Sequence, residues 1–177
     1  MNATVQPRVT STDEAGEFPF AAADYVLHLL AAIVMFRDAA LDIELKPLGL
    51  NIGRFRALSI LVRCGSCTMT ELSVYSAIDR TTLTRVADHL VAEGLVRRLG
   101  AAKDRRQVLL ELTEEGRARH AEAYQVIADC NRRIAVGIEE PEIRSTVRLI
   151  STIIENQTDN AARRASLLRF GRGENPA

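Results

Sequence analysis

The sequence predicts a mostly α-helical protein in which two short helices are followed by a small β-hairpin, with long helices flanking this unit on both sides. Three observations carry that prediction: a capping motif at Thr68, an apolar stripe from Leu83 to Leu90, and a basic tip at Gly100 to Arg106 between two short strands. The chain has 177 residues, of which 47% are hydrophobic, and this is enough for one real core. We therefore expect an ordinary soluble, folded protein.

The first of the two central helices is predicted to begin beside Thr68. Glu71 follows Thr68 by three residues, which is the spacing of a capping box. In this motif each side chain binds the backbone N–H of the other residue. The helix should start at Met69 or Thr70 and run to about Ala77.

The second central helix is predicted to follow at once, with Asp79 as its N-cap. Leu83, Val86, Ala87 and Leu90 are spaced so that they form one apolar stripe against the core. The opposite face and its flanks carry Arg80, Thr81, Thr82, Thr84, Arg85, Asp88 and His89. These are residue types that read the grooves of DNA.

A β-hairpin is predicted after this helix. Gly94 has the position of a C-terminal cap, and the strands are expected at Leu95 to Leu99 and at Gln107 to Leu112. The tip between them contains Lys103, Asp104, Arg105 and Arg106. The tip is therefore basic.

The order of helix, turn, helix and basic hairpin is typical of a winged helix-turn-helix that binds double-stranded DNA. The second helix would enter the major groove, and the basic tip would reach phosphates or a narrow minor groove. Thr68 and Thr70, at the start of the preceding helix, are further DNA-binding candidates. The alternative is that Arg85, Arg105 and Arg106 are ordinary solvated charges.

The distribution of charge favours DNA although the formal net charge is zero. Ten Arg and Lys residues and six Asp and Glu residues lie between Leu50 and Leu112, so the remainder of the chain is acidic. A basic middle between acidic ends is expected of a DNA reader with separate flanking helices.

Long amphipathic helices are predicted on both sides of this reader. The first runs from about Phe20 to Leu45, and Asn51 caps the next one. After the hairpin, Thr113 caps a long helix that Gly137 ends, and Pro141 lies near the start of the last helix. The first and last helices have more apolar surface than one small core covers, which favours pairing with a second chain. The alternative is that they fold back on their own chain.

Several segments resemble the MarR family of bacterial transcriptional regulators. The segments are Thr68 to Leu72, Asp79 to Arg85, Leu90 to Arg98, Asp104 to Arg106, Leu112 to Gly116 and, upstream, Leu48 to Leu58. The most specific part is an Asp-x-Arg wing signature followed by Leu-Thr-x-x-Gly. The resemblance covers roughly residues 20 to 160.

This resemblance implies roles for particular residues. Arg106 would enter the minor groove, Asp104 would orient basic side chains of the wing, and the helix from Arg80 to Glu93 would read the major groove. The family also implies that the flanking helices form a homodimer and that a small aromatic acid binds between the first, second and fifth helices. Tyr25 and His28 are the candidates for that effector site on the first helix.

The function predicted from these features is a homodimeric repressor that binds a pseudo-palindromic operator and is released by a small aromatic or phenolic effector. The first alternative is the same DNA reader controlled by oxidation of Cys64, Cys67 and Cys130. The second is a thiol oxidoreductase or protein-interaction module that does not bind DNA. Cys64 and Cys67 are expected in the loop between two helices, which is not the setting of a redox motif.

No catalytic constellation is predicted, because His28, His89 and His120 fall on different helices without an identifiable Ser or Cys partner. No enzyme activity, cofactor or metal is expected. The apolar stretch from Ala21 to Phe36 is too short and too polar to cross a bilayer, so we predict no membrane partner and a cytoplasmic protein.

The domain prediction is a disordered tail at residues 1–17, one domain at 18–168 and a flexible tail at 169–177. Within the domain, residues 50–112 would form the DNA-binding part, and residues 18–48 and 113–168 would form the dimerisation helices.

Overall fold

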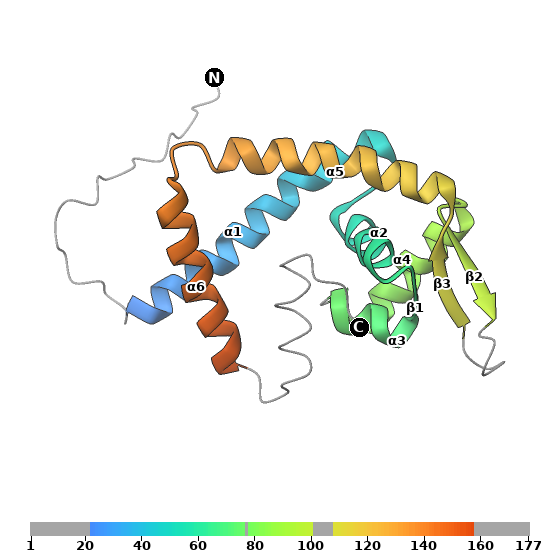
Figure 1. The fold of residues 1–177 in the computed structure, drawn as a ribbon, viewed down its shortest axis with the longest axis horizontal. Helices are drawn as coiled ribbons and strands as arrows, with labels where there is room; N and C mark the ends of the chain where they lie inside the picture. Colours follow the sequence, from blue (N-terminus) through green and yellow to red (C-terminus); the bar gives the residue numbers. More distant parts are fainter. Residues whose placement is uncertain (1–21, 77, 101–107, 158–177) are drawn as a thin grey trace, which may run out of the picture. The chain divides into compact units, whose positions relative to one another are not determined.

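The structure is a computed structural model that describes residues 22–76, 78–100 and 108–157 (Figure 1). Both predicted tails, residues 1–17 and 169–177, and the tip of the hairpin lie outside the described residues. The chain divides into two compact units, residues 1–37 and 38–177. The boundary between them falls within the first helix, α1 (Ala22–Leu45).

The second unit contains the predicted helices and strands in the predicted order (Figure 1). After α1 come a short 3-10 helix, η1 (Lys46–Leu48), and then α2 (Ile52–Cys64), β1 (Ser66–Thr68), α3 (Met69–Ser76), α4 (Arg80–Ala92), β2 (Val96–Gly100), β3 (Val108–Leu112), α5 (Glu114–Ile134) and α6 (Glu140–Gln157). The mostly helical fold with long flanking helices is therefore confirmed.

The predicted helix caps are present. Thr68 and Glu71 form the capping box, since the Thr68 N–H donates to Glu71 Oε2 over 2.8 Å and the Glu71 N–H donates to Thr68 Oγ1 over 3.2 Å. Asn51 and Thr113 accept hydrogen bonds from the first turns of α2 and α5 in the same way. These local signals define the helix starts, because each cap satisfies a backbone N–H that has no partner inside the helix.

The sheet differs from the prediction, because it has three strands rather than the two of a hairpin. β3 lies in the centre, with β2 antiparallel on one side and β1 antiparallel on the other. Cys67 of β1 faces Leu110 of β3 in this register. The segment expected to be a plain loop is thus partly a strand, because the edge of β3 offers backbone hydrogen bonds that a local sequence pattern does not reveal.

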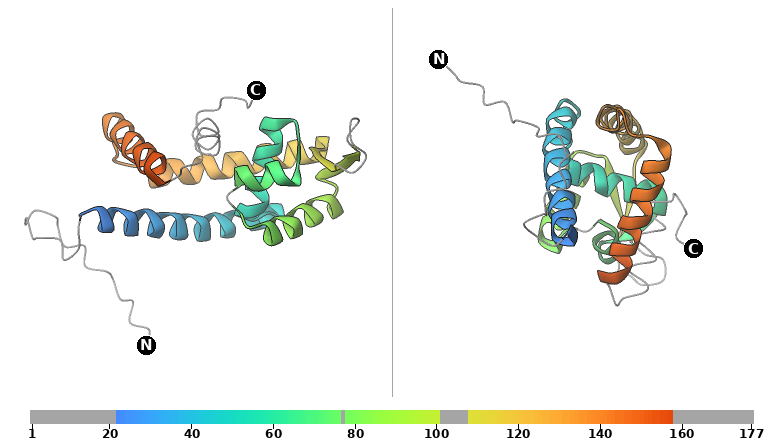
Figure 2. Two further views of the ribbon diagram at one scale, coloured as in Figure 1. Left: turned by 90° about the horizontal axis from the view of Figure 1, so that it is seen from below. Right: turned by 90° about the vertical axis from the view of Figure 1, so that its left-hand side faces the viewer.

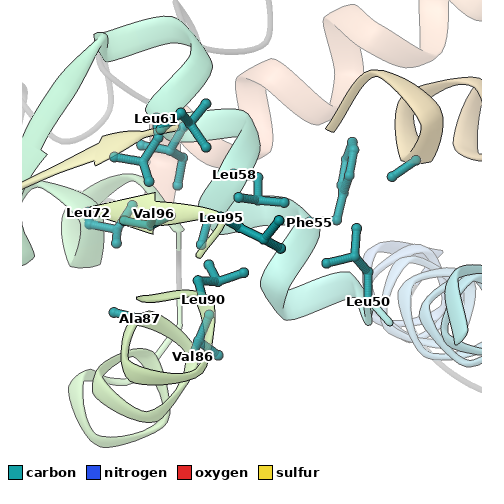
Figure 3. Close-up of a cluster of buried hydrophobic side chains, with 14 of the residues drawn as sticks. Leu50, Phe55, Leu58, Leu61, Leu72, Val86, Ala87, Leu90, Leu95 and Val96 are labelled. Carbon is teal, nitrogen blue, oxygen red and sulfur yellow. The ribbon is translucent and has the colours of Figure 1, made fainter. Parts of the chain in front are cut away.

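The core of the second unit is assembled around α2 (Figure 3). Phe55, Leu58 and Leu61 of α2 are buried in one apolar cluster with Leu72 of α3 and Leu90 of α4. α2 also contacts α5 and β3. Burial of each large apolar side chain stabilises the fold by about 1.5–3 kcal/mol, so this cluster holds the two central helices and the sheet together.

The structure explains why the Leu-Thr-x-x-Gly motif ends in a glycine, Gly116. A Cβ atom on Gly116 would lie 2.0 Å from the backbone oxygen of Leu95, so only glycine lets the first turn of α5 approach the sheet this closely. Thr113 reinforces the same junction by donating a hydrogen bond to the Gly94 carbonyl over 2.7 Å. The motif therefore fixes α5 against the start of β2.

Candidate nucleic-acid interface

α4 is held firmly at both ends. The Asp79 carboxylate accepts a hydrogen bond from the Thr82 N–H over 2.9 Å. Hydrogen bonding by the Thr82 side chain, and next by this N–H, holds the pKa of Asp79 below its ordinary value. At the other end Gly94 has φ 73°, and the N–H groups of Gly94 and Leu95 bind the carbonyls of Val91 and Leu90. The helix therefore has a fixed start and a fixed end.

The two faces of α4 differ sharply. Leu83, Val86, Ala87 and Leu90 are buried, as the spacing predicted. All seven predicted groove-reading side chains are exposed: Arg80, Thr81, Thr82, Thr84, Arg85, Asp88 and His89. The folded chain thus presents a polar surface from the first turn of α4 onward.

Arg80, Thr81, Thr84 and Arg85 line one hollow at the start of α4. The exposed Thr84 hydroxyl donates to the Arg80 carbonyl over 2.8 Å, which leaves its oxygen able to accept a hydrogen bond. Among the described residues, neither Arg80 nor Arg85 has an ion-pair or hydrogen-bond partner for its guanidinium group. Two forked donors at a helix N-terminus suit the acceptors of base edges and phosphates.

Other arginines of this part of the chain have partners. Arg97 of β2 donates to Glu111 of β3 over 2.6 Å, and Arg54 of α2 binds Glu93 over 2.8 Å. Arg98 of β2 binds Asp88, a residue that we predicted as a groove contact. The structure thus assigns Asp88 a contact within the chain, which ties α4 to β2. Figure 2 shows the chain passing from α4 directly into β2.

Thr68 and Thr70, the DNA-binding candidates at the start of α3, lie in different environments. The Thr68 hydroxyl is occupied by the capping box, because it also donates to Glu71 Oε2 over 2.9 Å. Thr70 is exposed. Of these two residues, Thr70 has the more available hydroxyl.

The predicted wing contacts are Lys103, Asp104, Arg105 and Arg106, and all four lie outside the described residues. Their roles remain predictions. The strands on either side of them are described, with Gly100 of β2 paired to Val108 of β3.

A cavity of about 480 Å³ lies between α2, α3 and α5. It is lined by Phe55, Arg56, Ser59, Ile60, Val62, Arg63, Tyr75, Ser76, His120, Tyr124 and Ile127. Ser59 Oγ and His120 Nε2 lie 3.0 Å apart, so the expectation that His120 has no Ser partner was wrong. The two residues are 61 positions apart on different helices, and no local spacing could have shown their contact.

The predicted effector residues Tyr25 and His28 lie on α1 in the first unit, and both are exposed. Neither belongs to the lining of the cavity between α2, α3 and α5. Their role in effector binding remains a prediction.

The three cysteines are free thiols. Burial is the main reason that the pKa of Cys67 rises to about 12, and it also raises the pKa of Cys64. Thiols with a raised pKa carry little thiolate at neutral pH and react slowly with oxidants. This environment gives no support to redox control at Cys64 and Cys67.

The comparisons with known proteins agree with this geometry. The family model described as MarR family matches residues 50–108. The multiple antibiotic resistance protein MarR of Escherichia coli K12 is 30% identical over 120 residues, which span 67% of this chain and 83% of that protein. This chain belongs to the MarR family. It is therefore a winged-helix regulator of transcription.

Relatives within the MarR family include the homoprotocatechuate degradative operon repressor of E. coli, 26% identical over 130 residues that span 71% of this chain and 87% of the repressor. A mutant E. coli MarR complexed with operator DNA has a TM-score of 0.69 at 25% identity, covering 77% of this chain and 99% of that one. Bordetella bronchiseptica BpsR, studied for regulation of its DNA binding by 6-hydroxynicotinic acid, has a TM-score of 0.70 at 25% identity, covering 80% and 100%.

Within the part of the chain that the structure describes, no three or more His, Cys, Asp or Glu side chains form a group that could hold a metal ion. None of the helices described for this MarR-family chain is long and apolar enough to cross a membrane.

Proposed function

We propose that this MarR-family regulator is a homodimeric repressor that binds a pseudo-palindromic operator and is released by a small aromatic effector. The observation that carries the proposal is the outer face of α4, where Arg80 and Arg85 have no partner among the described residues. A helix with this face and a fixed position on its own core is suited to lie in the major groove.

Support for direct reading of DNA comes from how this face is held. The buried residues Leu83 and Leu90 anchor α4 in the core, and Arg98 links it to β2 through Asp88. The hairpin would then follow the helix on the duplex, with Arg106 at the minor groove. The E. coli MarR complex with operator DNA supports the same use of the fold.

Support for a homodimer comes from exposed apolar side chains on the flanking helices. On α1 these are Leu29, Ile33, Val34, Met35 and Phe36, and on α6 they are Ile143, Val147 and Leu149. Large apolar surfaces on a soluble protein mark interaction sites, and closed two-fold dimers are the commonest assembly. We propose residues 18–48 and 113–168 as the dimerisation part and residues 50–112 as the DNA-binding part of one domain.

Support for a small effector comes from the cavity between α2, α3 and α5. Its volume of about 480 Å³ lies within the range of small-molecule sites. α2 forms one of its walls and also contacts α4. A ligand that fits one position of α2 better than another would therefore shift α4, and a coupling of about 1–3 kcal/mol would lower DNA affinity about five- to 150-fold.

The test is footprinting of the purified full-length protein on DNA upstream of its own gene, with sedimentation of the same sample. We expect protection of two half-sites about one helical turn apart, roughly 10 base pairs centre to centre, by a protein with the mass of a dimer. Protection of a single asymmetric site by a monomer would contradict the proposal.

A further inference from the structure

His120 occupies an ordered position in the cavity between α2, α3 and α5. Its ring stacks on Phe55 of α2, with centroids 5.2 Å apart and planes 5° apart. Tyr124, one turn later on α5, lies 6.2 Å away at 33°. The Ser59 hydroxyl lies 3.0 Å from Nε2. One face and one edge of the imidazole are therefore held by α2, which fixes the direction in which the ring can bind a ligand.

The ionisable side chains that line this cavity with His120 are Arg56 and Arg63 of α2, Tyr75 of α3 and Tyr124 of α5, and no carboxylate belongs to the described lining. Arg56 is paired with Asp38, whose two carboxylate oxygens accept from it over 2.8 and 2.9 Å. A protonated His120 would therefore have no carboxylate partner within the described lining of the cavity.

Burial lowers the pKa of the His120 imidazole below its ordinary value, which favours the neutral ring. An anion bound in the cavity would reverse that balance, since it neutralises a cation and compensates for its lost hydration. Phe55, Tyr75 and Tyr124 also line the cavity, and aromatic side chains pack well against a flat ring.

We propose that His120 is the specificity-determining residue of this cavity, where its imidazolium pairs with the carboxylate of a planar aromatic acid while Ser59 holds the ring in place. The proposal deepens the proposed function, on which it rests for the effector role. The binding itself requires no DNA.

Proton uptake is the consequence that distinguishes this proposal from simple shape recognition. The acid is already ionised at neutral pH, so the proton that His120 gains comes from solvent. Affinity for the acid should be greatest below the pKa of His120 in the free protein and should fall as pH rises toward its pKa in the complex. If the acid raises that pKa by about one pH unit, affinity changes about tenfold across this window.

The experiment is isothermal titration calorimetry of the full-length protein without DNA at pH 5, 6, 7 and 8, in buffers of different ionisation enthalpy. The probes are 6-hydroxynicotinic acid and homoprotocatechuate, each compared with its neutral amide. We expect net proton uptake with at least one acid, binding that weakens by up to about tenfold as pH rises from 5 to 8, and weak binding of the matching amide without this loss. Absence of binding by both acids, or equal binding of acid and amide, would overturn the proposal.

Variants then assign the proton to a residue. His120→Gln keeps a polar group beside Ser59 but does not titrate, so it should abolish both the pH dependence and the preference for acid over amide. His28→Gln on α1 tests the other effector candidate with the same two readouts. Loss of the pH dependence in His28→Gln alone would transfer the role to His28 and contradict the proposal.

Folding of His120→Gln is checked by urea unfolding, and NMR titration of the three histidines in the parent protein decides the question if the variant does not fold. The acid must raise the pKa of the histidine assigned to position 120 and of no other. A mobility-shift assay with operator DNA on the same samples distinguishes failure of the His120 proposal from failure of the proposed repressor function. Loss of DNA binding with intact proton uptake would count against the repressor function alone, and DNA binding without proton uptake would count against His120 alone.

Discussion

α4 and α6 are both amphipathic helices, but the folded chain treats their apolar residues differently. α4 buries Leu83, Val86, Ala87 and Leu90 in the core and exposes its polar face. α6 has no buried residue, and Ile143 and Val147, one turn apart on its apolar side, are 38% and 57% exposed. The comparison shows that one chain is enough to bury the apolar side of α4. The apolar side of α6 stays exposed in one chain, and we propose that a second copy of the chain covers it.

The largest expected effect is the loss of an apolar side chain from α4. Leu83→Ala removes a fully buried side chain and should lower the free energy of unfolding by about 2–5 kcal/mol, because the cavity left behind closes only partly. Urea unfolding at several protein concentrations measures this. Ile143→Ala on α6, one turn before Val147, is the control, and its loss should be smaller and should depend on protein concentration, as for a side chain buried only in a dimer. Equal losses of unfolding free energy in the two variants at all protein concentrations would contradict the difference that we infer between α4 and α6.

The polar face of α4 gives the next effect. Arg85→Ala should weaken discrimination between the operator and a base-substituted operator by about 1–3 kcal/mol, because a bidentate contact to a base edge is lost. Arg144→Ala on α6 removes another exposed arginine, which lies 3.5 Å from Glu140, and should leave operator affinity unchanged. Fluorescence anisotropy with both DNA sequences is the measurement. An unchanged preference in Arg85→Ala would rule out base reading by this residue.

The apolar side of α6 gives the third effect. Val147→Glu places a charge on the face proposed to meet the second copy, and it should raise the dimer dissociation constant at least about tenfold, or about 1.4 kcal/mol. Ser145→Glu adds the same charge on the opposite side of the helix and should not. Sedimentation equilibrium compares the two. A dimer that withstands Val147→Glu would show that α6 pairs through other residues or not at all.

The difference between α4 and α6 also shows what the sequence can and cannot predict. The caps at Asp79 and Thr68 and the apolar stripe of α4 are local features, because they depend on residues three or four positions apart. The contact of Ser59 with His120 was beyond such reasoning, because it joins distant positions through the packing of α2 against α5.

The third strand of the sheet was missed for the same reason. β1 gains its partner only when β3 is brought alongside, so Ser66 to Thr68 carries no strand signal of its own. The link from Arg98 to Asp88 likewise depends on where β2 leaves the end of α4. Local sequence patterns were enough to predict the helices, the hairpin strands and the exposed face of α4. Which polar side chains contact each other depends on tertiary packing, which these patterns do not reveal.

The smallest expected effect concerns the N-terminal cap of α4 and its response to pH. Hydrogen bonds from Thr82 lower the pKa of Asp79 in the folded protein below the value of 3.8 for a free carboxyl. A carboxyl with a lowered pKa in the folded state stabilises the fold above its unfolded pKa, and this contribution is lost as pH falls through the folded pKa. Asp79→Asn keeps an oxygen that accepts from the Thr82 N–H but cannot titrate. It should therefore be slightly less stable than the parent at pH 6, where the charged carboxylate also favours the helix N-terminus, and this difference should shrink as pH falls to 2. Urea unfolding midpoints of both proteins at the two pH values measure the difference. A gap between them that stays constant with pH would mean that Asp79 caps α4 through its shape alone and contributes nothing through its charge.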